Sequence, residues 1–322
     1  MLVWLTAGLG LVILLLAGDA LVRGAVNMSL RLGIPALIVS LTIVAFGTSA
    51  PELLIAISAI EDNAPGLALG NVVGSNTANI LLVLGVPAIM SRLHTSVCDT
   101  RKNYVFMLGA TALFIALAFC GIFNWISGLI LLTALAFVLG DAFLMARNHR
   151  RNGKAAAAAG NVDELDDLEG ADPDMPWWKI GMFLVLGLIG LPLGADLLVD
   201  SAVDIARQFH VRETVIGLTL LAVGTSLPEL ATTVMAALRR QADVALGNVI
   251  GSNMFNLLAI VGIASLVGPI PVDPSFLRFD LWVMAGASLL ILPFVWFRAD
   301  ITRRWGVLLT VLYGVYITVI LL

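Results

Sequence analysis

Two motifs each occur twice in this chain, and the second copy follows the first at a constant spacing. Residues 42–53 read TIVAFGTSAPEL and residues 219–230 read TLLAVGTSLPEL, an offset of 177 residues. Residues 68–81 read ALGNVVGSNTANIL and residues 245–258 read ALGNVIGSNMFNLL, at the same offset. Because both motifs align at the same offset, with no insertion or deletion between them, we expect both halves of the chain to share one fold.

Most of each half consists of long runs without a charged side chain. Of the 322 residues 60% are hydrophobic and 12% are charged, whereas soluble proteins average about 25% charged residues. The run from Asn103 to Gly140 is nearly twice the roughly 20 residues that a spanning helix needs, and the turn-like residues 121–124 interrupt it. We therefore predict an all-α integral membrane protein with ten transmembrane helices, and we exclude soluble, disordered, disulfide-stapled and nucleic-acid-binding classes.

The basic residues predict how these helices are oriented. If successive connections alternate between the two sides, 15 of the 18 Lys and Arg residues lie on one side and only Arg207, Arg212 and Arg278 lie on the other. The positive-inside rule assigns the basic side to the cytoplasm. We expect a multi-pass protein of the cell inner membrane, with a retained first helix and both termini outside the cytoplasm.

Each half then holds five spans, which predicts that the halves are inverted relative to one another. The first repeat covers residues 1–147 and the second covers residues 179–322, and the acidic residues of 148–178 indicate a solvated cytoplasmic linker. Inverted repeats with matching Gly and Pro interruptions are typical of secondary transporters that bind their substrate near the membrane midplane.

Pro51 and Gly47 predict a break in the second span. Proline has no N–H, so the carbonyl of Gly47 loses its helical partner, and glycine adds flexibility at the same place. Pro228 and Gly224 repeat the pattern. Exposed backbone oxygen at membrane depth is tolerated only where it is buried in protein or lines a cavity. We therefore expect broken helices at the midplane, beside a cation or water.

Glu52 and Glu229 are the only acids in the middle of charge-poor spans. A charge at the bilayer centre costs about 2.5–3.5 kcal/mol on insertion scales, and neither motif contains Lys, Arg or His. A bound cation accounts for both carboxylates, and protonation is the alternative. Thr48 and Ser49 lie four and three residues before Glu52, which places their hydroxyls on the same helix face.

The second motif adds neutral oxygen atoms. Ser75 and Asn79 lie four residues apart, as do Ser252 and Asn256, so each pair shares a helix face. Calcium binds six to eight oxygen atoms, and carboxylates, carbonyls and amides supply them. The three histidines lie at span ends and neither cysteine lies in a motif, which disfavours zinc, copper and haem. We expect no cofactor other than the transported ions.

The remaining polar and small residues of the motifs favour structural roles. Asp19 and Asp196 lie near span ends and are expected to be interfacial or helix-capping. The other motif asparagines are expected to form hydrogen bonds at the helix breaks. The motif glycines are expected to permit close helix packing. These two groups are Asn71, Asn76, Asn248 and Asn253, and Gly70, Gly74, Gly247 and Gly251.

The doubled GTSAPE/GTSLPE and GNVVGSN/GNVIGSN motifs resemble the paired alpha repeats of sodium/calcium exchangers in the cation/calcium exchanger superfamily. The resemblance covers both halves and implies calcium/sodium antiport by alternating access, with the first and sixth helices sliding against a fixed core. It implies that Glu52 and Glu229 bind both ions. It also implies that the sodium sites are completed by Thr48, Ser49, Thr225, Ser226, Ser75, Ser252, Asn79, Asn256 and the backbone carbonyls of Ala45 and Ala222.

The chain departs from some members of that superfamily, which carry an aspartate where this chain has Asn256. Two ionised glutamates carry two negative charges, which one calcium or two sodium ions would cancel, and a third sodium would make exchange electrogenic. Potassium dependence and stoichiometry stay open. The expected partners are calcium ions, sodium ions and the lipid bilayer, without nucleic acid. Proton/calcium exchange is the main alternative, and a passive channel is another. An enzyme is disfavoured because the motif serines lack a general base.

Overall fold

The structure is a computed structural model that describes residues 2–95, 100–158, 172, 174–209 and 222–321. It consists of helices apart from two short antiparallel strands, β1 (Ile122–Phe123) and β2 (Ile270–Pro271). Within the described ranges, seven helices are long and apolar enough to cross a membrane, or eight if one bent pair is a single span. The predicted all-α membrane fold is confirmed.

The first half contains helices interrupted at both motifs. Among the described residues, three segments are π-helical turns, which are rare and often lie at functional sites. Two of them, η1 and η2, belong to this half. In chain order the elements are α1 (Leu2–Leu32), α2 (Ala36–Val39), η1 (Ser40–Val44), α3 (Ala45–Thr48), α4 (Ala50–Glu61), α5 (Pro65–Ala78), η2 (Asn79–Val83), α6 (Gly85–Met90), α7 (Arg101–Ala118) and α8 (Trp125–Ala158).

The described helices of the second half follow a similar order, although α16 and α17 together take the place of α7, and the counterparts of α2 and η1 (213–221) lie outside the described part. The π-helical turn η5 takes the position of η2 at the 177-residue offset. The elements are α9 (Trp177–Gln208), α11 (Ala222–Gly224), α12 (Leu227–Leu238), α13 (Ala242–Met254), η5 (Phe255–Ile260), α14 (Val261–Val267), α15 (Pro274–Arg278), α16 (Asp280–Leu290), α17 (Leu292–Trp296) and α18 (Arg303–Leu321).

The count of ten spans stays a prediction. The run 103–140 does divide into α7 and α8, and Gly121 lies between them with a φ of 82°. Residues 210–221 lie outside the described part. They include the start of the predicted span at Thr214, the residues His210 and Arg212, and the first residues of the repeated motif, 219–221. The predicted linker lies outside it at 159–171 and 173, and its first residues, 148–158, are helical because α8 continues to Ala158.

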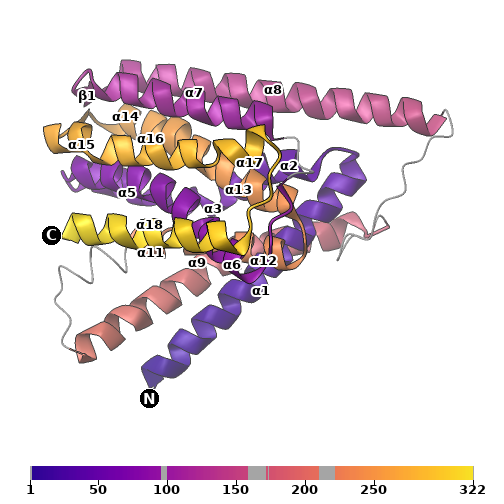
Figure 1. Cartoon of the computed structure of the whole chain (residues 1–322), viewed down its shortest axis with the longest axis horizontal. Coiled ribbons are helices and arrows are strands. Elements are labelled where there is room, and N and C mark those ends of the chain that lie inside the picture. The colour runs from indigo at the N-terminus through magenta and orange to yellow at the C-terminus, as the bar shows by residue number, and fades with distance from the viewer. Residues whose placement is uncertain (1, 96–99, 159–171, 173, 210–221, 322) are drawn as a thin grey trace.

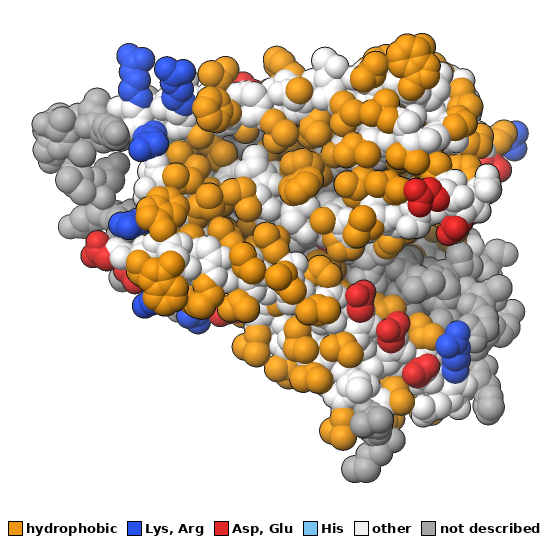
Figure 2. All heavy atoms as spheres, turned by 180° about the vertical axis from the view of Figure 1, so that it is seen from behind, with side chains coloured by type: hydrophobic (Ala, Val, Ile, Leu, Met, Phe, Trp, Pro, Cys, Tyr) orange, Lys and Arg blue, Asp and Glu red, His pale blue; other side chains and the backbone are white. Residues whose placement is uncertain are grey.

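The two helical spans that carry the GNVVGSN and GNVIGSN motifs lie at the centre of the molecule. In the spans Pro65–Met90 and Ala242–Val267, 78% and 89% of the apolar window is buried, against 17% for α8. The peripheral helices leave large apolar side chains exposed, as a lipid-facing surface requires. Figure 2 shows hydrophobic side chains over most of one face, with the charged side chains gathered mainly toward its two ends.

Two long helices, α1 and α9, run obliquely to α5, α7, α8, α16 and α18 (Figure 1). They pack against each other in antiparallel directions and approach closely at glycines. A Cβ on Gly10 would lie 2.8 Å from the backbone of Leu198, and one on Gly187 would lie 2.6 Å from Leu21. These two contacts are equivalent at the 177-residue offset. Antiparallel pairing of equivalent helices is the arrangement expected of inverted repeats.

Candidate functional site

The helices break where the sequence predicts. The second span bends by 40° between α3 and α4, with Ser49 at the break and Pro51 in the first turn of α4. In the second half α11 ends at Gly224, and α12 begins with Pro228 in its first turn. A proline is tolerated there because the first turn of a helix has no intrahelical N–H partners to lose. The two breaks place one glutamate each in the first turns of α4 and α12.

Glu52 and Glu229 are almost completely removed from solvent, with 1% and 0% of each residue exposed. Among the described residues neither carboxylate forms a salt bridge with Lys, Arg or His. The hydroxyl of Ser49 donates to Glu229 Oε1 over 3.3 Å. A serine of the first half therefore contacts the carboxylate of the second half, so the two motifs meet in one site.

Hydroxyl pairs extend this contact symmetrically. Thr48 Oγ1 lies 3.4 Å from Ser252 Oγ, and Ser75 Oγ lies 3.4 Å from Thr225 Oγ1. Each pair joins a GTS motif of one half to a GSN motif of the other. The two pairs are equivalent at the 177-residue offset. The site is therefore built from four segments, two from each half, that contact one another across the halves.

Two asparagines mark the centre of this arrangement. Asn76 Nδ2 donates to the carbonyl of Asn253 over 3.2 Å, and Asn253 Nδ2 donates to the carbonyl of Asn76 over 3.4 Å. A reciprocal contact of this kind arises where equivalent residues meet across a twofold pseudo-axis. Asn79 Nδ2 also donates to Asn253 Oδ1 over 3.1 Å.

Several buried oxygen atoms of the site have no hydrogen-bond partner among the described residues. An unsatisfied buried polar atom costs about 1–3 kcal/mol, and more if it is charged. Here they are clustered, and all are hard oxygen ligands of the type that sodium and calcium bind. They are Glu52 Oε1 and Oε2, Glu229 Oε2, Asn79 Oδ1, Asn256 Oδ1 and Ser226 Oγ.

The predicted backbone ligands and packing glycines have different surroundings. The carbonyl of Ala45 accepts from the backbone N–H of Ser49 over 3.0 Å and from Thr48 Oγ1 over 3.2 Å. Ala222 is the first residue of α11 and follows residues outside the described part. Gly251 packs as predicted, because a Cβ there would lie 2.5 Å from the carbonyl of Leu41 in η1. A Cβ on Gly247 would lie 2.9 Å from the carbonyl of Leu37 in α2. Gly70 and Gly74 do not show such an approach, because a Cβ on either would have no atom within 4 Å among the described residues.

One charged contact near the site was not anticipated from the sequence. Asp19 on α1 pairs with Arg23 over 2.9 Å and with Arg239, which caps the end of α12. Near it, a Cβ on Gly18 would lie 3.0 Å from the carbonyl of Ala231 in α12. The helix α1 is therefore seated directly on the helix that carries Glu229. The charge pattern alone places Arg239 in a connection, and only the fold brings it to Asp19.

The equivalent side of the molecule is open. In the described part of the chain, α9 has no packing on α4 comparable to that of α1 on α12. A cavity of about 290 Å³ lies there, and Leu54, the counterpart of Ala231, is 67% exposed. The cavity reaches the break in the second half and is lined by Pro51, Ile55, Pro192, Ala195, Asp196, Val199, Asp200, Gly224, Thr225 and Pro228.

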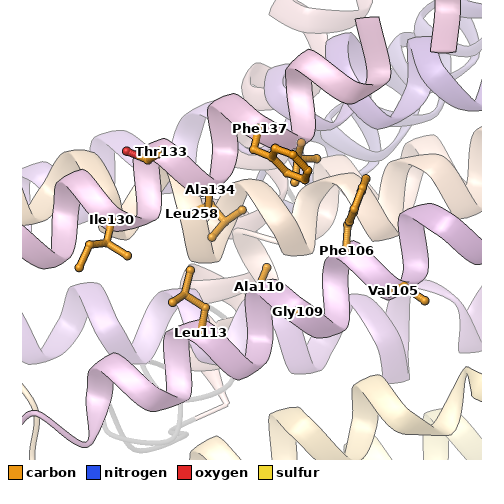
Figure 3. A pocket seen from close by; sticks show the side chains of 11 residues that line it. Val105, Phe106, Gly109, Ala110, Leu113, Ile130, Thr133, Ala134, Phe137 and Leu258 are labelled. Carbon is orange, nitrogen blue, oxygen red and sulfur yellow. The ribbon is translucent and has the colours of Figure 1, made fainter. Parts of the chain in front are cut away.

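A second cavity, between α7 and α8, has a different character. Its volume is about 530 Å³, and apolar side chains of both helices, such as Phe106 and Phe137, face it (Figure 3). Thr133 carries the only hydroxyl among its lining residues. This cavity offers no set of oxygen ligands, so the cluster around Glu52 and Glu229 is the candidate ion site.

Comparisons with known proteins agree with this geometry. The profile of a family described as "Sodium/calcium exchanger protein" matches residues 2–143 and 179–322. The chain is 35% identical to "Putative antiporter CaxA" of Alkalimonas amylolytica, over 88% of this chain and 86% of that protein. It is 33% identical to "Sodium/calcium exchanger MaX1" of Methanosarcina acetivorans, over 97% of this chain and 96% of that protein.

Solved structures of the sodium-calcium exchanger NCX_Mj have a similar fold. A structure soaked with zero Na+ and Ca2+ superposes with a TM-score of 0.79 at 32% identity, covering 99% of both chains. A structure soaked with 2.5 mM Na+ and 1 mM Sr2+ superposes with a TM-score of 0.78. The likeness extends over both halves of the chain.

Proposed function

Because the chain belongs to the sodium/calcium exchanger protein family, we propose that it is a secondary active antiporter that exchanges sodium for calcium across the membrane. The family consists of transporters and not of enzymes. One observation carries the proposal: two buried glutamates, one from each half, have no basic partner among the described residues, and three of their carboxylate oxygens have no hydrogen bond there. Two carboxylates in an apolar interior need compensating charge, and a bound cation supplies it.

The oxygen set favours calcium and sodium as the ions. Both glutamates are calcium and sodium ligands in this proposal, and Asn79 and Asn256 contribute amide oxygens that are buried and unpartnered. The neutral remainder of the set is Thr48, Ser49, Thr225, Ser226, Ser75, Ser252 and the carbonyls of Ala45 and Ala222. Six to eight oxygen ligands match the demand of calcium. Sodium binding uses the same hydroxyls and amides, which proton exchange at two carboxyls would not need.

The unequal packing of α1 and α9 against the other helices supports exchange by alternating access. The cavity beside α9 includes Thr225 among its lining residues, while α1 covers the equivalent surface of α12. Movement of the α1–α9 pair against the central helices would close the cavity beside α9 and uncover the equivalent surface of α12. The basic side of the chain is cytoplasmic in this proposal, so both termini lie outside the cytoplasm of an inner-membrane protein.

The proposal is tested with purified protein reconstituted in lipid vesicles. Vesicles loaded with sodium are diluted into sodium-free medium that contains radioactive calcium, with pH clamped equally on both sides. Calcium uptake that requires the sodium gradient is the expected result. Matched vesicles loaded with potassium or choline are the controls. Uptake driven by an imposed pH gradient without sodium would replace the proposal with proton/calcium exchange, and uptake without any counter-ion would indicate a channel.

A further inference from the structure

The two glutamates are held differently by their own halves. In the second half, Thr233 Oγ1 donates to the carbonyl of Glu229 over 2.7 Å, one turn earlier on α12. Asn248 Nδ2 donates to Thr233 Oγ1 over 3.1 Å and to the same carbonyl over 3.3 Å. Asn248 Oδ1 accepts from Thr48 Oγ1 over 3.4 Å. One asparagine thus ties the turn that carries Glu229 to α13 and to the helix break of the other half.

The first half lacks this tie. At the 177-residue offset the counterpart of Thr233 is Ala56, which has no hydroxyl, and the counterpart of Asn248 is Asn71. In the part of the chain that the structure describes, Asn71 Nδ2 is buried without a hydrogen-bond partner. Both carboxylate oxygens of Glu52 are also unpartnered. The repeat preserves the asparagine but not the group that it binds.

The carboxylates differ in the same sense. Glu229 Oε1 accepts from Ser49 over 3.3 Å. Ser226, the counterpart of Ser49, has no partner among the described residues. The backbone and the side chain of Glu229 are therefore both held, whereas the equivalent groups around Glu52 are not.

We propose that Asn248 and Thr233 are positioning residues that fix Glu229 as a preorganised anchor, and that Glu52 is the carboxylate that reorients when calcium replaces sodium. This inference rests on the proposed exchange function. Calcium and sodium differ in charge and in the number of oxygens they require, so a shared site needs at least one ligand that changes position. A ligand without hydrogen bonds moves at the lowest cost, and a held ligand lowers the entropy lost on binding.

Replacement of Thr233 by valine tests the anchor. Valine keeps the branched shape but removes the hydroxyl, which leaves Asn248 Nδ2 without its side-chain acceptor. We expect the apparent KM for calcium to rise about tenfold, as for the loss of one buried hydrogen bond, while the maximal exchange rate stays within about twofold. Thr233→Ser retains the hydroxyl and is expected to restore the wild-type KM.

The converse variant is Ala56→Ser, which gives Asn71 a hydroxyl at the position where Asn248 finds one. We expect this variant to hold the turn of Glu52, and therefore to lower the maximal exchange rate several-fold without raising KM for calcium. Both constants are measured in reconstituted vesicles, and calcium binding is measured separately by calorimetry in detergent. Elution as a single peak on size exclusion checks the fold of each variant.

The outcomes separate this inference from the proposed function. If the wild-type protein shows no sodium-driven calcium uptake, the proposed function fails. If the wild-type exchanges ions but Thr233→Val and Thr233→Ser share the wild-type KM, the anchor is refuted. If Thr233→Val does not fold, an unchanged rate in Ala56→Ser refutes the assignment of Glu52 as the moving carboxylate.

Discussion

Most described helices of the two halves correspond at the 177-residue offset, but α1 and α9 pack differently against the other helices. Gly18 lets α1 approach α12, and Asp19 pairs there with Arg239. The counterparts in the second half are Ala195 and Asp196, which line a cavity. Equal repeats thus occupy unequal environments within one structure. In the proposed exchange by alternating access, a transporter built from inverted repeats exchanges such environments, and we propose that the helices packed differently in the two halves are the ones that move.

The contact of α1 with α12 and the equivalent region beside α9 also differ in the sign of their charges. At the 177-residue offset, Arg23 corresponds to Asp200 and Arg239 corresponds to Asp62. The contact of α1 with α12 therefore combines one acid with two bases, whereas the equivalent positions beside α9 hold only acids. If the basic side is cytoplasmic, as the positive-inside rule predicts, the acidic positions lie toward the opposite side, where their negative charge would attract cations.

The strongest test of what the halves share is the removal of either carboxylate charge. Glu52→Gln and Glu229→Gln are each expected to reduce sodium-driven calcium uptake at least about a hundredfold, because the remaining single charge does not balance a divalent ion in an apolar site. Uptake is measured in vesicles with matched protein content. Glu61→Gln, at the exposed end of α4, is the control and should retain full activity. Exchange in either site variant would contradict the site assignment.

The next test removes the contact that distinguishes the packing of α1 from that of α9. Asp19→Asn removes the contact with Arg239, and we expect α1 to leave α12 more often. The buried Thr232 of α12, replaced by cysteine in a background without Cys98 and Cys120, reports this exposure. Labelling by a small polar thiol reagent should accelerate about tenfold, which corresponds to about 1.4 kcal/mol.

Asp196→Asn is the matched control for this labelling experiment. Asp196 has no salt bridge in the described part of the chain and lines the cavity beside α9. Its replacement should leave labelling at position 232 unchanged. Equal acceleration in both variants would show that loss of an acidic charge, and not loss of the α1 contact, exposes α12.

A smaller effect is expected from Gly18→Ala, which gives α1 the side chain that α9 carries at Ala195. The added methyl would lie 3.0 Å from the carbonyl of Ala231, so α1 and α12 must separate by a few tenths of an ångström. We expect the exchange rate to fall about threefold, since close approach at small residues stabilises helix pairs in membranes. Gly8→Ala on the same helix has open space around it and should keep the wild-type rate.

The sequence predicts the shared features well. The break positions follow from proline and glycine chemistry, and the constant offset predicts that Glu52 and Glu229 belong to one site. The all-α membrane class follows from the length of the uncharged runs. These inferences succeed because each depends on local residue chemistry or on a count along the chain, and neither changes when distant segments meet.

The asymmetry between the halves could not be predicted in the same way. Asp19 was interpreted as an interfacial or capping residue, because its partner Arg239 is 220 residues away and lies outside the motifs. The Thr233–Asn248 bond was missed for a related reason, since the motif alignment stops at Leu230. A signal was nevertheless present. Comparison of the halves beyond the motifs shows Thr233 opposite Ala56, a polar-to-apolar difference at a buried position in otherwise matched helices.

The smallest effect tests whether the halves are equivalent at their centre. Asn76→Ala and Asn253→Ala each remove one bond of the reciprocal pair, and the partner carbonyls then lose a donor. Each variant should lower the free energy of unfolding by about 1 kcal/mol, measured by thermal melting in detergent. Asn253→Ala should be slightly more destabilising, because Asn79 also donates to its side chain. The double variant should cost less than the sum of the two, since both bonds belong to one contact. Fully additive losses would mean that the two asparagines act separately, which would weaken the argument for a twofold pseudo-axis between the halves.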